Sequence, residues 1–99
     1  MDYTGLVEFE WDKKKSDLCL AHRGFDFHYV VRVFADPNAI VRSDTRRDYG
    51  EDRFELIGKV GQRVFVVVYT RRFNAIRVIS ARRANQREVG RYDSHSNKS

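Results

Sequence analysis

The sequence has few of the residues that build covalent or metal-bound frameworks. Its single cysteine, Cys19, excludes an intramolecular disulfide and any multi-cysteine metal site, and we expect it to be a small packing residue. The three histidines, His22, His28 and His95, lie far apart, and no HxxxH, HxxE or paired-carboxylate pattern occurs, so we predict no metal. Glycine-rich phosphate loops and dinucleotide fingerprints are also missing, so we predict no cofactor.

Long hydrophobic segments are missing too. No apolar run approaches the roughly 20 residues that cross a bilayer. The first ten residues, MDYTGLVEFE, are acidic and lack the basic and apolar regions of a signal peptide. We therefore expect a cytoplasmic protein without membrane contact. A length of 99 residues predicts a single domain over residues 1–93, followed by a polar tail over residues 94–99.

Acidic residues are almost absent from residues 63–91, which read RVFVVVYTRRFNAIRVISARRANQREVGR. This stretch, called here the basic stretch, holds eight of the fourteen arginines and a single carboxylate, Glu88. Its formal charge is +7, and the net charge of +5 leaves −2 for the rest of the chain. Arginine presents a planar fork that binds phosphate through two hydrogen bonds. We therefore predict an anionic partner, and nucleic acid, RNA in particular, is the leading hypothesis.

Hydrophobic periodicity predicts an α+β fold with the element order β-α-α-β-β-β-β-α. The first strand is expected at residues 6–11, and Asp12 and Gly24 are expected to bound a helix that carries Lys15, Leu18, Cys19 and His22 on one side. The remaining predicted elements are a helix over 27–34, strands over 39–41, 53–60, 63–70 and 75–81, and a helix over 85–92. The apolar strand 63–70 should be central in an antiparallel sheet packed against helices.

Arginines of the basic stretch are the first candidates for a binding site. Arg77 lies in mid-strand, on the face expected for Ile79 and Ala81, where it needs a carboxylate, an exposed position or an anionic ligand. A ligand and a salt bridge to Glu51, Asp52 or Glu55 both remain open. Arg82 and Arg83 precede the last helix, whose N–H groups favour an anion.

Three other side chains have both a functional and a structural interpretation. Glu88 can act as a base or orient an arginine, but the Asn85-x-x-Glu88 spacing favours a helix capping box. Tyr69 can stack on a base or pack in the core, and neither is favoured. Trp11 is expected in the core rather than against a base.

Several segments together resemble one family. They are FEWD (residues 9–12) with Lys15 and Gly24, FADPNA (34–39), GEDR (50–53), VVVYTRR (66–72), and IRVISARRA (76–84) followed by Tyr92. In this order they resemble the BrnT family of bacterial type II toxins over nearly the whole chain. The resemblance implies a RelE-like fold and a ribonuclease that arrests translation. It also implies a partner, a BrnA-type ribbon-helix-helix antitoxin, in a hetero-oligomer that contacts operator DNA only through the antitoxin.

The resemblance also points to site residues by position, and Arg63 and Arg71 are added to them as further arginines of the basic stretch. We expect the catalytic set to be Arg77, Arg82, Arg83, Ser80, Glu51, Tyr69 and Lys15, and the RNA-binding set to be Arg53, Arg63, Arg71, Arg72 and Trp11. The expected reaction is metal-independent, with the RNA 2′-OH attacking phosphorus and arginines stabilising the extra charge. Glu51, Lys15 or Tyr69 would transfer protons. The alternative is a non-catalytic basic module, an inactive relative that binds an antitoxin-like protein or DNA.

Overall fold

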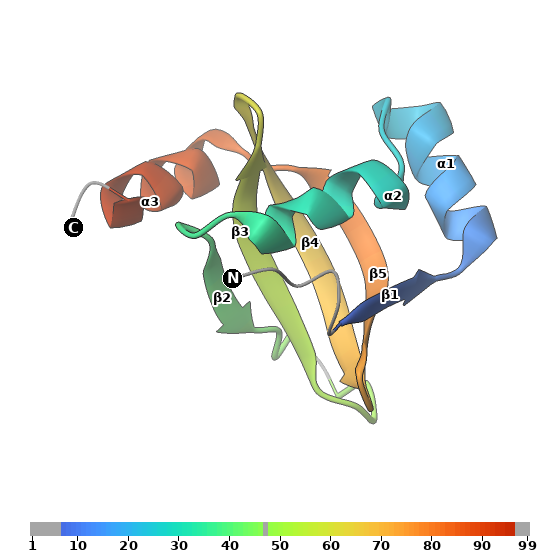
Figure 1. Ribbon diagram of the computed structural model, residues 1–99. Helices are drawn as coiled ribbons and strands as arrows, with labels where there is room; N and C mark the ends of the chain where they lie inside the picture. The colour runs from blue at the N-terminus through green and yellow to red at the C-terminus, as the bar shows by residue number, and fades with distance from the viewer. Residues whose placement is uncertain (1–6, 47, 97–99) are drawn as a thin grey trace.

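The computed structural model describes residues 7–46 and 48–96 and shows one sheet with helices on both faces (Figure 1). The elements in chain order are β1 (Glu8–Trp11), α1 (Lys13–Arg23), α2 (Phe27–Val30), the 3-10 helix η1 (Val31–Ala35), β2 (Ile40–Ser43), β3 (Arg53–Val60), β4 (Arg63–Arg72), β5 (Ala75–Arg83) and α3 (Gln86–Ser96). The predicted fold class and element order are confirmed. None of the helices in the described ranges is long and apolar enough to cross a membrane.

The five strands lie in the order β1-β5-β4-β3-β2, so β4 is central as predicted. Strands β2 to β5 pair antiparallel, but β1 pairs parallel to β5, with Glu10 beside Arg77. The expectation of a fully antiparallel sheet was therefore wrong at this edge. The long excursion through α1, α2, β2, β3 and β4 separates β1 from β5, which is the kind of crossover that parallel pairing requires.

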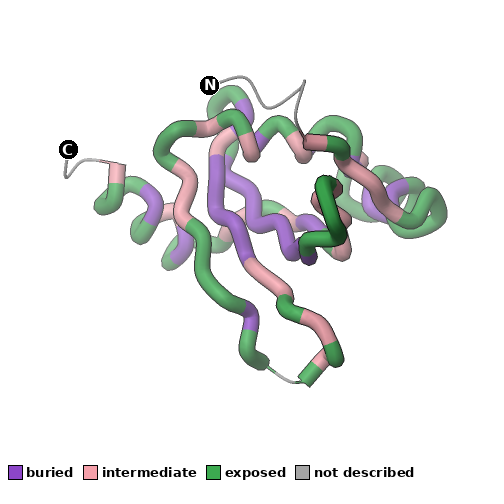
Figure 2. The backbone as a smooth tube through the Cα atoms, turned by 60° about the horizontal axis from the view of Figure 1, so that its bottom comes forward, coloured by how far each residue is buried: buried purple, intermediate pink, exposed green. Residues whose placement is uncertain are grey.

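Both faces of the sheet are covered by apolar cores, and residues 64–70 of β4 are buried without interruption (Figure 2). The larger core joins Phe27, Val30 and Val33 of α2 and η1 to Val67 and Tyr69. The smaller core packs Tyr92 of α3 against Ile57 and Val66 on the opposite face. An unbroken apolar strand is the expected sequence for a strand buried on both sides.

The helix boundaries follow from local hydrogen bonds. The Asp12 carboxylate accepts from the N–H groups of Lys14 and Lys15, and Gly24 ends α1 in the left-handed conformation with φ 85°. Lys15, Leu18, Cys19 and His22 line one hollow, as expected for residues on one side of α1. The buried residues of α1 are Ser16 and Cys19, whereas Leu18 is exposed. The predicted second helix divides into α2 and η1.

Helix α3 is held at its start by a capping box and further along by Tyr92. Asn85 Oδ1 accepts from the Glu88 N–H and Glu88 Oε1 accepts from the Asn85 N–H, each at 2.9 Å, which confirms the capping box. Tyr92 donates to Asp36 Oδ2 at 2.6 Å, and the same oxygen accepts from the Lys59 N–H at 2.8 Å. The helix continues to Ser96, four residues beyond the predicted end, while residues 97–99 of the expected tail lie outside the described ranges.

Candidate functional site

The sheet face opposite α2 carries polar side chains in rows set by strand register. Arg53, Thr70 and Arg77 are successive partners across β3, β4 and β5, and Glu10 of β1 continues this row. The next row joins Glu55, Val68 and Ser80. We call this surface the polar face, defined by Arg53, Thr70, Arg77 and Ser80. Its far end is covered by α3, beside Ile57 and Val66.

A β-bulge in β5 decides which residues share this face. Tyr69 pairs with Val78 and Val68 pairs with Ser80, so Ile79 has no partner in β4. The extra residue reverses the alternation, because a strand's side chains change face with every residue. Ala81 is consequently buried with Val78 in the helix-side core, so the predicted shared face of Arg77, Ile79 and Ala81 was incorrect for Ala81. The polar face instead groups Arg77 with Ser80.

Two hollows meet at the bulge, and Ile79 and Ser80 line both. The first, of about 400 Å³, is lined by Arg46, Tyr49, Arg53 and Val68 beside the shared pair. The second, of about 390 Å³, lies toward α1 and is lined by Lys15, Leu18, Cys19, His22, Arg23, Phe27 and Ala81 in addition. Ser80 is exposed between them. The structure thus brings the predicted residues Lys15, Ser80 and Arg53 to one region of the surface.

The arginines of the polar face have carboxylates nearby, at distances longer than those of close ion pairs. Arg77 Nη1 lies 3.9 Å from Glu10 Oε1, and the carboxylate of Glu51 lies 3.3 Å from Arg53 Nε and 3.7 Å from Arg72 Nη2. The partner of Arg77 is Glu10 rather than the predicted Glu51, Asp52 or Glu55, because β1 docks parallel to β5. Partly exposed pairs at such separations contribute little to stability. These arginines can therefore exchange a carboxylate for a phosphate.

Arg82 has a different environment. It forms a two-pronged pair with Glu88, whose carboxylate oxygens lie 2.7 and 2.9 Å from the guanidinium nitrogens, and Glu88 is buried. Hydrogen bonds from Arg82 hold the pKa of Glu88 at about 2, well below its ordinary value. The anion at the start of α3 is thus the protein's own carboxylate, and the open phosphate site expected there is occupied by Glu88.

The loop between β2 and β3 supplies residues that the sequence did not single out. It extends away from the two cores as an exposed arm (Figure 2). Buried Asp44 accepts two hydrogen bonds of 2.8 Å from the Arg46 guanidinium, which lowers the pKa of Asp44 to about 2. Arg53 lies over the Tyr49 ring at 3.9 Å. Arg46 and Tyr49 had no motif that marked them as site residues.

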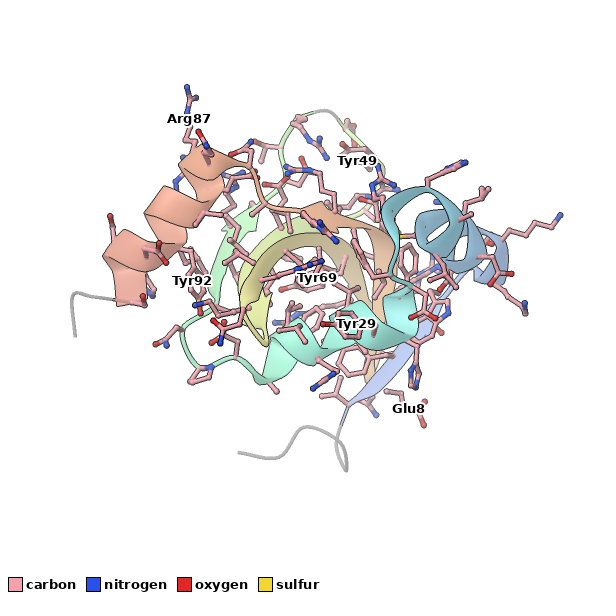
Figure 3. The ribbon with its side chains drawn as sticks, turned by 90° about the horizontal axis from the view of Figure 1, so that it is seen from above. Glu8, Tyr29, Tyr49, Tyr69, Arg87 and Tyr92 are labelled. Atoms are coloured by element: carbon pink, nitrogen blue, oxygen red, sulfur yellow. The ribbon has the colours of Figure 1, made fainter. Side chains whose placement is uncertain are left out.

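Several predicted site residues lie away from the polar face. Tyr69 is buried between Phe34 and Phe54, on the side of the sheet that faces α2 (Figure 3), so it packs and cannot stack on a base. Trp11 packs edge-on against Phe27 in the same layer, as expected.

Three basic residues also point to the helix side of the sheet. Arg63 and Arg83 line a separate hollow with Phe25, Phe65 and Tyr29. Arg71 lies 6.0 Å from the Phe54 ring centroid in the helix-side layer. The predicted RNA-binding and catalytic sets therefore divide between two faces.

Comparison with known proteins gives one family. The family model described as the ribonuclease toxin, BrnT, of type II toxin-antitoxin systems matches residues 11–88 of the 99-residue chain. The match covers β1 from Trp11 through the capping box of α3, and so includes the polar face and both hollows. No curated protein matches the chain.

Proposed function

Since the chain belongs to the BrnT family of ribonuclease toxins of type II toxin–antitoxin systems, we propose that it is an endoribonuclease whose polar face binds single-stranded RNA. The observation that supports this placement is the position of Ser80 between two hollows. Basic side chains from α1, the β2–β3 loop and β3 line these hollows. A phosphate backbone crossing β5 at the bulge would meet cations on both sides, as single-stranded nucleic acid grooves require.

The chemistry follows from the residue types on this face. The RNA 2′-OH attacks the adjacent phosphorus, the bond from phosphorus to the 5′ oxygen breaks, and a 2′,3′-cyclic phosphate and a 5′-hydroxyl form. Arg77 and Arg53 stabilise the additional negative charge on the phosphorane, and their long contacts to Glu10 and Glu51 leave them able to turn to it. No metal ion takes part in this proposal.

Proton transfer needs one group to accept the 2′-OH proton and another to protonate the leaving oxygen. Glu51, next to Arg53, is the proposed base. Lys15 and His22 line the hollow on the other side of Ser80, and either can supply the second proton. Tyr69, which the sequence offered for this role, is buried in the core. Ser80 is placed to donate a hydrogen bond to a nonbridging phosphate oxygen.

The family implies an antitoxin partner. We propose further that this partner is a BrnA-like ribbon-helix-helix protein, that the complex contacts operator DNA through it, and that RNA cleavage arrests translation in the cytoplasm. A passive basic module that binds the antitoxin without cutting RNA is the competing function. Expression of the chain alone should arrest growth and leave cut RNA, whereas a passive module would do neither.

The cleavage reaction is tested with purified protein and single-stranded RNA in EDTA. Products should carry 2′,3′-cyclic or 3′-phosphate ends, and Arg77→Ala should lower the rate on the order of 100-fold while keeping the fold. Arg87→Ala is the matched control, because Arg87 is an exposed arginine of α3 that lines neither of the two hollows. Strict dependence on magnesium, or an unchanged rate in Arg77→Ala, would refute the proposed site.

A further inference from the structure

Phe73 is the most exposed large apolar side chain of the described residues. It occupies the turn between β4 and β5, and its relative exposure is 106%. Other exposed apolar residues, such as Leu18 at 55% and Val41 at 51%, keep about half of their surface covered. Burial therefore does not explain a phenylalanine at this tip.

Backbone conformation makes the choice of residue more unusual. Phe73 has φ 54°, and among the described non-glycine residues it alone adopts a positive φ. Glycine occupies this region without steric cost, whereas a side chain such as phenylalanine is strained there. The fold would be served better by glycine at this position. A residue that is both strained and fully exposed indicates a role in binding rather than in stabilising the fold.

The surroundings indicate what the ring meets. Phe73 directly follows Arg71 and Arg72, and Arg72 lies 3.7 Å from Glu51, the carboxylate that also neighbours Arg53 on the polar face. Arg77 follows four residues along β5, a distance of about 13 Å in an extended strand. A few nucleotides of single-stranded RNA span that length. An aromatic ring beside arginines at the edge of a phosphate-binding face is the arrangement by which proteins hold unpaired bases.

We propose that Phe73 is a stacking platform for a nucleobase of the RNA substrate, next to the segment whose phosphates lie on the polar face. Arg72 would contact a phosphate next to this base. The inference rests on the proposed ribonuclease function and adds a base-binding position outside the reacting centre. It makes Phe73 a residue for binding and positioning RNA, without contact to the reacting phosphate.

The test compares Phe73→Tyr, Phe73→Leu and Phe73→Gly with the unchanged protein. The probe is a fluorescent single-stranded 2′-O-methyl RNA oligonucleotide, which cannot be cleaved because it has no free 2′-OH. Tyrosine should keep the affinity, and leucine and glycine should weaken it on the order of 10- to 100-fold. Phe73→Gly should also melt at the same temperature or higher, because the strain is relieved, so lost binding cannot be attributed to unfolding.

A second comparison separates base stacking from phosphate contacts. Arg72→Gln should reduce the slope of log affinity against log salt by about 0.7, as loss of one phosphate contact on a single strand does, while Phe73→Gly should leave the slope unchanged. An abasic nucleotide at the stacked position should weaken binding to the unchanged protein and have little further effect on Phe73→Gly.

Three results would overturn the inference. If Phe73→Leu binds like the original protein, the contact is merely apolar. If Phe73→Gly keeps full RNA affinity but loses a concentration-dependent self-association, the ring contacts a second copy of the chain. In both cases the proposed ribonuclease function stands. If the unchanged protein neither binds nor cleaves RNA, the inference and the proposed function fail together.

Discussion

Replacing Glu88 by Gln tests how the start of α3 is held to the sheet. The Glu88 carboxylate bonds both terminal nitrogens of Arg82, lies 3.9 Å from Arg42, and accepts from the Asn85 N–H. Glutamine can still complete a capping box but carries no charge. The substitution therefore removes the ion pairs while keeping the helix cap. It leaves Arg82 without its anion, whereas Arg42 keeps Glu55, whose carboxylate lies 2.6 Å from Arg42 Nε.

The size of the effect follows from the pKa of Glu88, which falls from 4.5 to about 2 in the folded protein. A shift of this size corresponds to about 3 kcal/mol of folding free energy at neutral pH. Because the Arg82 side chain is 42% exposed, solvent screening reduces the expected loss to about 2 kcal/mol. For a domain of this length that is a fall in melting temperature of roughly 8–16 °C.

The pH dependence gives the sharper test. A carboxyl group with a lowered folded-state pKa stabilises the protein above its unfolded pKa, and this contribution disappears as the pH falls through the folded value. The difference in unfolding free energy between Glu88→Gln and the original protein should thus be full at pH 7. It should shrink as the pH falls from about 4.5 to about 2. Urea unfolding followed by circular dichroism measures it.

The matched control is Asp17→Asn, which removes an exposed pair with Lys13 at 2.9 Å. Exposed pairs of this type contribute about 0.5 kcal/mol or less. If Glu88→Gln proves no more destabilising than this control at pH 7, or if its deficit is equally large at pH 2, the buried pair does not hold α3 as inferred.

Three further substitutions test local packing and the hydrogen bond that holds α3. Gly58→Ala places a Cβ 2.9 Å from Leu56 Cδ2 and 3.2 Å from Val33, and should lower the unfolding free energy by about 1–3 kcal/mol. Gly90→Ala adds a Cβ with nothing within 4 Å, and should raise the unfolding free energy by about 0.5–1 kcal/mol because alanine favours the helix. Equal melting temperatures for the two variants would contradict this expectation. Tyr92→Phe removes the 2.6 Å hydrogen bond to Asp36 and should lower the unfolding free energy by about 1–2 kcal/mol in the same urea assay. An unchanged value would show that this hydrogen bond does not hold α3 to the segment around Asp36.

Elements with strong local signals were predicted accurately from the sequence. Residues 53–60 form β3 as predicted, and Asp12 and Gly24 bound α1, because turn and capping signals are encoded by neighbouring residues. The parallel pairing of β1 was missed, because register between strands so distant in sequence depends on tertiary packing. The extension of α3 to Ser96 was missed for a related reason, since Tyr92 is held from outside the helix by Asp36.

The candidate site was predictable in its residue types and only partly in its geometry. Arg53, Arg77 and Ser80 do share one face, but no local pattern indicates the bulge that brings Ser80 onto it. Arg46 and Tyr49 were missed because they lie in an irregular loop, where neither periodicity nor capping constrains a prediction. The catalytic roles assigned by resemblance remain predictions.

The bulge at Ile79 also changes the meaning of the basic stretch. A formal charge of +7 over one hairpin suggests a single cationic surface, but alternation across β4 and β5 sends Arg63, Arg71 and Arg83 to the helix side. Arg82, on the other side, is neutralised by Glu88. The basic stretch contributes Arg72 and Arg77 to the polar face. Binding of an anion there therefore also needs basic residues from outside the stretch, namely Arg53, Arg46 and those of α1. The site is therefore a product of the fold, and the charge of one segment marks only its approximate place.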